Sequence, residues 1–172
     1  MILIGDEIKK RIVGLDVATA KNIAWNFGKL SKDTLNKAKA IDSVKLTWPA
    51  ANYTATWNGK SWDLMHDGKP DVTSDGVQLS PTTFLIQNVV IADSIYKDKT
   101  GAVTPQSVTV GEGSGWVLRD GVAISAIWNR PDPQSGTTWR DLEGNEIKFA
   151  AGQIWIALTD KAPEFTAATA SK

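Results

Sequence analysis

Two apolar runs near the middle of the chain, residues 116–119 and 122–128, are separated only by Asp120-Gly121. Two intervening residues of this type favour a type I′ β-hairpin, in which both turn residues have a positive φ. Such a turn would place Arg119 opposite Val122, and both faces of the hairpin would then carry bulky apolar side chains. A half-exposed antiparallel sheet would instead alternate apolar and polar residues. The pattern therefore predicts a central hairpin that is covered on both sides.

The first forty residues follow the helical period. Apolar residues recur every three or four positions from Ile4 to Leu15, and a second helical stretch is expected over residues 16–27. Ser31 is placed to cap a short third helix. We expect these short helices to pack on one side of the strands that follow.

After the helical segment the apolar period changes from 3.6 to two, which is typical of strands. Asn58-Gly59 is a second two-residue turn of the hairpin type. The hairpin that it predicts places Tyr53, Trp57 and Trp62 on the same face, while the opposite face is polar. This hairpin is therefore one-sided, unlike the central one.

Residues 84–92 are apolar except for Gln87 and Asn88. A continuous apolar run of this length is typical of a strand that is covered on both faces. An amide inside such a strand needs a hydrogen-bond partner, because an unpaired one would cost roughly 1–3 kcal/mol. We expect one of the two amides to be buried and hydrogen-bonded.

These elements together predict an α+β fold of mostly antiparallel β-sheets in stacked layers, with the short N-terminal helices packed on one side. Three regions follow in order: a helical segment (1–40), a β-rich domain (41–162) and a disordered tail (163–172) rich in Thr, Ala and Ser.

Composition excludes several classes of function. The chain has 172 residues, and its 19 Lys and Arg residues balance its 19 Asp and Glu residues, so no bulk field recruits nucleic acid. It has no cysteine, one histidine (His66) and no serine in a nucleophile elbow, so no catalytic residue, metal site or cofactor is expected. No apolar run reaches the roughly 18 residues of a membrane span.

Two other patterns invite chemical interpretations. The run Gly111-x-Gly113-x-Gly115 suggests a phosphate loop, but a hairpin and not a helix follows it, so a bend in the backbone is the better interpretation. Two carboxylates facing each other across a cleft could hydrolyse a glycan. The candidates for such a pair, nearly all in turns, are Glu112, Asp120, Asp132, Asp141 and Glu143.

The eight tryptophans are the one excess in the composition, and most fall on predicted strands. Packing between the layers is the ordinary role of such residues. The sharper alternative is an exposed platform of Trp57 and Trp62, with His66 just beyond it. Arg119 and Arg130 would then be the cationic groups for an acidic polymer or partner.

The order of motifs from Trp48 to Leu158 resembles the C-terminal domain of the YerB-like family of secreted bacterial lipoproteins, whose function is unknown. The resemblance rests on short motifs in a shared order: Gly68-Lys69-Pro70, residues 87–91, residues 110–115, Leu118, residues 126–128, Trp139, Asp141, Gly144 and residues 152–156. It implies an extracytoplasmic domain with no established enzymatic activity. It also implies that residues 1–40 are the end of an upstream domain, and that membrane contact occurs only through a lipid anchor absent from this chain.

The function expected from the sequence is a non-catalytic binding or scaffolding domain at the bacterial cell envelope. Its partner would be a cell-wall polymer or an envelope protein, at the residues Trp57, Trp62, His66, Arg119 and Arg130. The alternative is an envelope hydrolase that acts on glycan or peptide through paired carboxylates.

Overall fold

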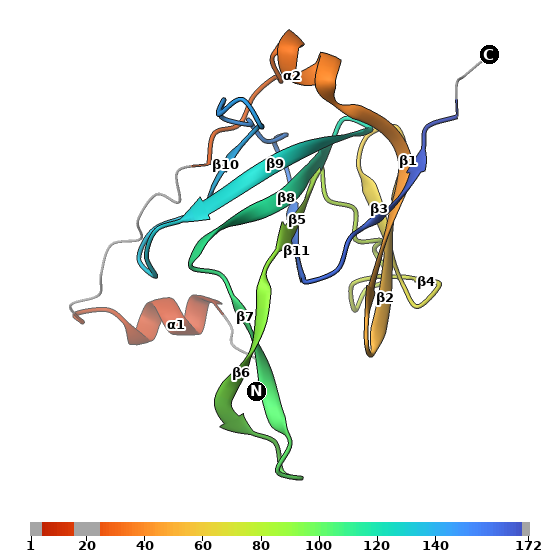
Figure 1. The fold of residues 1–172 in the computed structure, drawn as a ribbon. Helices are drawn as coiled ribbons and strands as arrows, with labels where there is room; N and C mark the ends of the chain where they lie inside the picture. The colour runs from red at the N-terminus through yellow and green to blue at the C-terminus, as the bar shows by residue number, and fades with distance from the viewer. Residues whose placement is uncertain (1–4, 16–24, 170–172) are drawn as a thin grey trace.

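The computed structural model describes residues 5–15 and 25–169 (Figure 1). Among these residues lie two short helices, α1 (Gly5–Arg11) and α2 (Lys32–Lys37), and twelve strands. The fold is therefore mostly β, and the predicted α+β class is correct only in its β part. Ser31 caps α2 as expected, because its hydroxyl accepts the backbone N–H of Thr34 at 3.0 Å.

The helix expected over residues 16–27 lies mostly outside the described residues, and its described end is not helical. Phe27 instead forms an isolated bridge to Phe149, and Trp25 packs edge-on against the same ring at 5.4 Å. At the described end of this stretch, Trp25 and Phe27 therefore attach the chain to Phe149. Contact with a partner distant in sequence decides the local conformation here.

Ten strands form one curved sheet that folds over itself at β1 (Lys39–Trp48), so two smaller sheets share this strand. The first sheet contains β11 (Ile154–Thr159), β5 (Thr83–Asn88), β8 (Gly111–Arg119), β9 (Val122–Arg130) and the start of β1, with β10 (Thr138–Arg140) beside β9. The second contains the rest of β1, with β12 (Glu164–Ala167) on one side and β2 (Ala51–Trp57), β3 (Trp62–His66) and β4 (Lys69–Pro70) on the other. The pairs are antiparallel except β11 with β5, which is parallel.

Two hydrophobic cores lie on opposite faces of the first sheet. One core fills the space between the two sheets and includes Phe84, Leu118 and Trp62. The other lies on the far face and includes Val117, Ile124 and Trp128. The central hairpin formed by β8 and β9 contributes to both cores, so its predicted burial on both sides is confirmed.

The turn of this hairpin is also confirmed. Asp120 and Gly121 have φ values of 52° and 73°, and Arg119 pairs with Val122. Among the described residues, the predicted helices contribute to the cover on the far face through Ala38, the C-cap residue of α2. The rest of this cover comes from the segment around Trp25 and Leu30, together with β10 and the loop that carries Ile147 and Phe149.

The second hairpin has a four-residue loop, which differs from the predicted two-residue turn. Trp57 pairs with Trp62, Gly59 has a φ of 94°, and Asn58 does not have a positive φ. The Asn58 side-chain oxygen accepts the backbone N–H groups of Lys60 and Ser61, and these bonds stabilise the longer loop. Because the register shifts by two residues, the predicted shared face of Trp57 and Trp62 is preserved.

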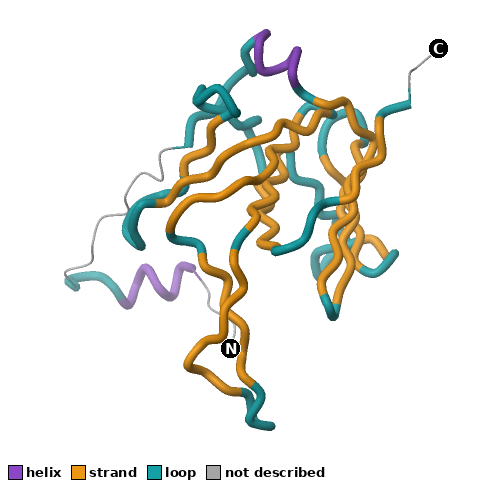
Figure 2. The backbone as a smooth tube through the Cα atoms, viewed as in Figure 1, coloured by secondary structure: helices purple, strands orange, loops and turns teal. Residues whose placement is uncertain are grey.

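The apolar run 84–92 does not form a single strand. Its first part belongs to the interior strand β5, and the chain then enters β6 (Val90–Lys97), which pairs only with β7 (Val103–Val108). Figure 2 shows these two strands leaving the body as a narrow ribbon, which we call the β6–β7 arm. Ile95 and Tyr96 on the arm are 89% and 69% exposed.

The amide prediction within this run is met only in part. Gln87 is buried at 4% exposure, but its side-chain nitrogen has no hydrogen-bond partner among the described residues. Asn88 is half-buried and donates to the Ser114 hydroxyl at 3.2 Å. The buried amide is therefore not the hydrogen-bonded one.

The predicted disorder of residues 163–172 is wrong as far as residue 169. Strand β12 pairs with β1 over Ile41 to Lys45, and Phe165 packs against Trp116 at 4.8 Å between ring centroids. One aromatic side chain and a free edge on β1 order a segment whose composition alone suggests a tail.

In the described part of the chain, no helix has both the length and the apolar composition of a membrane span.

Candidate functional site

Four aromatic side chains gather at one end of the second sheet. The Tyr53 ring stacks on the His66 ring, with centroids 4.6 Å apart and an angle of 13° between the planes. Trp48 meets Tyr53 edge-on at 5.9 Å, and Trp155 lies 6.2 Å from Tyr53 on the other side. Strand pairing explains part of this arrangement, because Tyr53 and His66 are directly opposite each other on β2 and β3.

Three of these rings, Trp48, Tyr53 and Trp155, border a groove of about 320 Å³ that we call the aromatic groove. Its lining residues come from the β1–β2 connection, β5 and β11: Trp48, Ala51, Tyr53, Phe84, Trp155, Ile156, Ala157 and Leu158. The Trp48 indole N–H donates to the Leu158 carbonyl at 2.9 Å and holds the two sides of the groove together. Apolar walls with a few polar groups are typical of a ligand site.

Strand β11 is an edge strand, because β5 is its only neighbour among the described strands. The carbonyls of Gln153 and Thr159 accept N–H groups from the β5 side, at 3.3 and 2.9 Å. In a parallel ladder, alternate residues point both backbone groups to the same neighbour, so Ile156 must point its own N–H and C=O away from β5. The outward carbonyl of Leu158 already accepts from Trp48, so the N–H and C=O of Ile156 are the backbone groups left for a ligand at this side of the aromatic groove.

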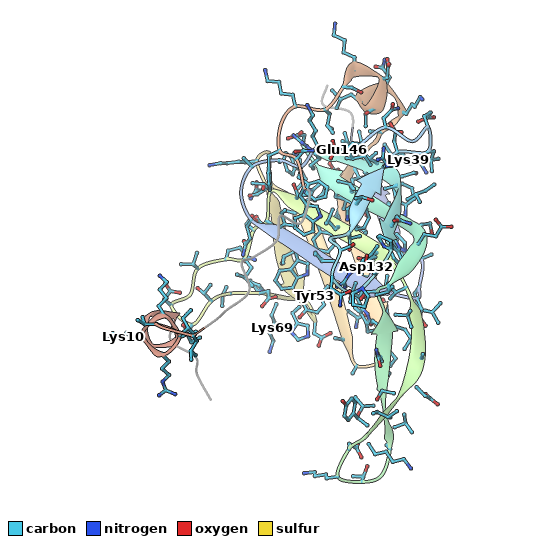
Figure 3. The ribbon with its side chains drawn as sticks, turned by 90° about the vertical axis from the view of Figure 1, so that its left-hand side faces the viewer. Lys10, Lys39, Tyr53, Lys69, Asp132 and Glu146 are labelled. Carbon is cyan, nitrogen blue, oxygen red and sulfur yellow. The ribbon has the colours of Figure 1, made fainter. Side chains whose placement is uncertain are left out.

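The other end of the groove is polar. Burial raises the pKa of the Tyr53 phenol, and the nearby carboxylates of Asp71 and Asp67 raise it further, so the phenol stays neutral at physiological pH. The backbone N–H of Asn52 bonds to Asp67 and lowers the pKa of that carboxyl group. Figure 3 shows Tyr53 and Lys69 on the same side of the molecule. A neutral hydroxyl with charged neighbours can hydrogen-bond to a bound molecule at this end.

The platform proposed for Trp57 and Trp62 is absent. Trp62 is fully buried, at 0% exposure, and Trp57 packs on it with ring centroids 5.1 Å apart. The face that they share is the inner face of the second sheet, and it meets Phe84 and Leu118 of the first. The one-sided hairpin thus buries its aromatic face against the first sheet, and the expected helices play no part.

His66 is exposed, as a platform would require, but it lies at the opposite end of the hairpin from Trp57. His66 stacks on Tyr53 but does not line the aromatic groove, and the three rings that do, Trp48, Tyr53 and Trp155, were missed as a group. Tyr53 was assigned to the right face, and Trp48 and Trp155 stand near strand ends. No sequence signal showed that β11 and the β1–β2 connection meet.

Arg119 is not available to a ligand. Its side chain is 6% exposed and donates to the carbonyls of Gly28 and Lys148 at 2.8 and 2.6 Å, and to the Asp120 carboxylate at 2.8 Å. The guanidinium therefore connects two loops that cover the second core. Its role is structural.

Replacing Arg119 by methionine is expected to lower the free energy of unfolding by about 2 to 4 kcal/mol. The substitution keeps the aliphatic stem but leaves two carbonyls without their donor. The measurement is urea denaturation, with Arg140→Met as the matched control, because Arg140 is exposed and bonds only to Gly144 in its own turn. A loss below about 0.5 kcal/mol at position 119 would contradict the structural role.

The Arg130 guanidinium is also hydrogen-bonded to neighbouring residues of the protein. Its N–H groups donate to the carbonyls of Ser135 and Pro133 and to the Thr109 hydroxyl, at 3.0, 2.7 and 3.2 Å. The two arginines expected to meet an acidic polymer therefore both hold loops in place.

Most of the carboxylates considered for a hydrolase have partners in turns. Four of the five accept hydrogen bonds or ion pairs from neighbours: Asp120 from Arg119, Asp132 from Gln134 and Ser135, Asp141 from Glu143 and Asn145, and Glu143 from Lys37. The fifth, Glu112, lies at a different cavity from the aromatic groove. No pair of them lines the groove.

The described residues form a β-rich domain with an aromatic groove whose lining contains no carboxylate. Residues 44–156 match the family described as the C-terminal domain of a protein of unknown function (DUF3048). The match covers more than half of the sequence, so the chain belongs to this family. No curated protein matches the sequence.

Among solved structures, the chain is similar to the crystal structure of the YerB protein from Bacillus subtilis, with a TM-score of 0.70 and 16% sequence identity. The similarity covers 94% of this chain and 53% of the YerB chain, so this chain spans about half the length of YerB. The resemblance to the YerB-like family expected from the sequence motifs is confirmed. At this identity the similarity establishes the fold alone.

Proposed function

We propose that this chain is a non-catalytic binding domain of a cell-envelope lipoprotein on the extracytoplasmic side, and that its aromatic groove binds an extended peptide segment of another envelope protein. The observation that carries the proposal is the groove itself, in which the rings of Trp48, Tyr53 and Trp155 lie beside the free edge of β11. The cellular location rests on the family resemblance.

The backbone of β11 favours a peptide over a glycan. Aromatic rings stack on sugars and on apolar side chains alike, so the rings alone do not distinguish the two. The outward N–H and C=O of Ile156 match the alternating donors and acceptors of an extended peptide, which would add to the sheet as a further strand. Alternate side chains of that peptide would point toward the rings.

The test is selection of random hexapeptides displayed on phage, followed by calorimetric titration of the chosen peptides. We expect Tyr53→Ala and Trp155→Ala each to weaken binding at least about tenfold, because each removes one wall of the groove. Tyr96→Ala is the matched control, since Tyr96 is an exposed aromatic residue on the β6–β7 arm and outside the groove.

Two measurements decide between the ligand classes, and two more test the location. N-methylation of alternate peptide amides should abolish binding if the peptide pairs with β11. If no peptide is selected and chitotetraose binds to the wild-type chain, a glycan ligand is favoured. To test the location, the full-length protein is followed in its native cells. It should incorporate labelled palmitate, and protease added to intact cells should digest it. A protein found only in the cytosol would refute the extracytoplasmic location.

A further inference from the structure

A second cavity, of about 620 Å³, lies where the β6–β7 arm leaves the first sheet. The β5–β8 pairing ends at Gln87 opposite Gly115, and the β6–β7 pairing begins at Val90 opposite Val108. Two residues connect these pairs on one side and six on the other, because β8 continues along β9 as far as Gly111. The strands therefore diverge, and the cavity opens between them.

Trp128 extends across this opening from β9. Its indole N–H donates to the Asn88 carbonyl at 2.8 Å, and the ring lies against Gly113. A side chain at position 113 would come within 2.8 to 3.0 Å of the ring, so the glycine is needed for this placement. The cavity thus has an aromatic wall, held by a hydrogen bond, next to the base of the β6–β7 arm.

The lining of the cavity is apolar on the side of the arm and acceptor-rich on the other. The apolar residues are Val89, Val90, Ile91, Val108, Val110 and Trp128, and the polar ones are Asn88, Glu112, Ser114 and Asp160. None of the lining residues is basic. The two carboxylates therefore give this cavity a negative charge on a chain whose net charge is zero.

Some acceptors at the cavity have protein donors and others do not. The Asn88 side-chain oxygen is buried without a hydrogen-bond partner, while its nitrogen donates to Ser114. Within the described part of the chain, Glu112 and Asp160 form no ion pair. Arg130, which pairs with Gly111 beside the cavity, directs its N–H groups to loop carbonyls and to Thr109.

We propose that this cavity binds a primary ammonium group carried on an aliphatic stem, as in a lysine side chain. An ammonium has three donors and no acceptor, which complements the two carboxylates Glu112 and Asp160 in the lining. The valine and isoleucine side chains accept the methylene stem, which gains by leaving water. The site is separate from the aromatic groove and does not depend on the function proposed for it.

The test is an NMR titration of the whole chain at neutral pH with three probes of equal length: 1-pentylamine, 1-pentanol and pentanoate. The indole N–H signal of Trp128, identified by its loss in Trp128→Phe, reports on the cavity. We expect pentylamine to shift this signal and the Asn88 signals with a Kd on the order of 1 mM, because both carboxylates are exposed. Pentanol and pentanoate should bind at least about tenfold more weakly.

Charge variants link the binding to the two carboxylates. Glu112→Gln and Asp160→Asn should each weaken pentylamine binding about threefold to tenfold, whereas Asp33→Asn in the first turn of α2 should leave it unchanged. Raising the salt concentration to about 0.5 M should weaken it further. Nα-acetyl-lysine methylamide should shift the same signals, which supports a lysine side chain as the natural form.

Three results would overturn the proposal. Equal binding of pentanol would show an apolar cavity without selection for charge. Unchanged binding in both charge variants would place the ammonium elsewhere. Calcium chloride that shifts the same signals at lower concentration than pentylamine would show a divalent-cation site instead. The unperturbed spectrum of each variant verifies that it is folded.

Discussion

Replacing Gly115 by alanine is expected to lower the free energy of unfolding by at least about 3 kcal/mol. Gly115 lies in the middle of the first sheet, opposite Gln87 on β5 and Ala126 on β9. An added Cβ would lie 2.4 Å from the Ile86 carbonyl oxygen and 2.9 Å from the Trp139 ring. The carbonyl belongs to the backbone of a buried strand, so it cannot move without disturbing the sheet.

The control for this variant is Gly68→Ala. Gly68 has a φ of 77°, but nothing lies within 4 Å of an added Cβ, so only backbone strain of about 1 kcal/mol is expected. Denaturant titration of both variants separates strain from close approach. If Gly115→Ala proves no less stable than Gly68→Ala, the close packing of β5, β8 and Trp139 in the structure is wrong.

Replacing Trp62 by alanine is expected to cost about 3 to 5 kcal/mol of folding free energy. The ring is fully buried between the two sheets, where it contacts the core that includes Leu64 and Phe84. Removing it leaves a cavity that the surrounding strands cannot close, because both sheets are paired over their length there. The measurement is again denaturant unfolding at constant pH.

Two further variants show that the cost comes from packing. Trp62→Phe should cost clearly less than the alanine variant, because it keeps most of the ring and removes an indole N–H that has no hydrogen-bond partner. Trp155→Ala, at the partly exposed aromatic groove, should cost less than Trp62→Ala as well. An alanine variant at Trp62 that remains as stable as wild type and loses only ligand binding would restore the platform hypothesis.

Local patterns predicted the parts of the fold that depend on neighbours in sequence. The Asp120-Gly121 turn set the register of the central hairpin, and the apolar residues on both its faces showed that it would be covered twice. The same pattern analysis failed for Asn58-Gly59, where the Asn58 side chain stabilises a longer loop. A side chain that bonds to its own loop competes with the turn preference of the dipeptide.

The sequence predicted that aromatic residues would form the candidate site, but it did not predict which of them meet. Tyr53 was assigned to the correct hairpin face, but His66 was expected in a loop beyond the hairpin, whereas it ends β3 opposite Tyr53. The ring partners Trp48 and Trp155 were not predicted. The groove forms because β11 pairs in parallel with β5 and its edge meets the β1–β2 connection. Such contacts join residues about a hundred positions apart, and no local period encodes them.

The sequence by itself determined the strand periods, the central turn and the absence of a cysteine, because each depends on residue type and short spacing. Only the tertiary structure decided which face of each strand is covered and by what. Trp62 and Tyr53 share one face of the same hairpin, yet Trp62 is core and Tyr53 lines the groove. The difference arises because the first sheet covers one end of that face and leaves the other end open.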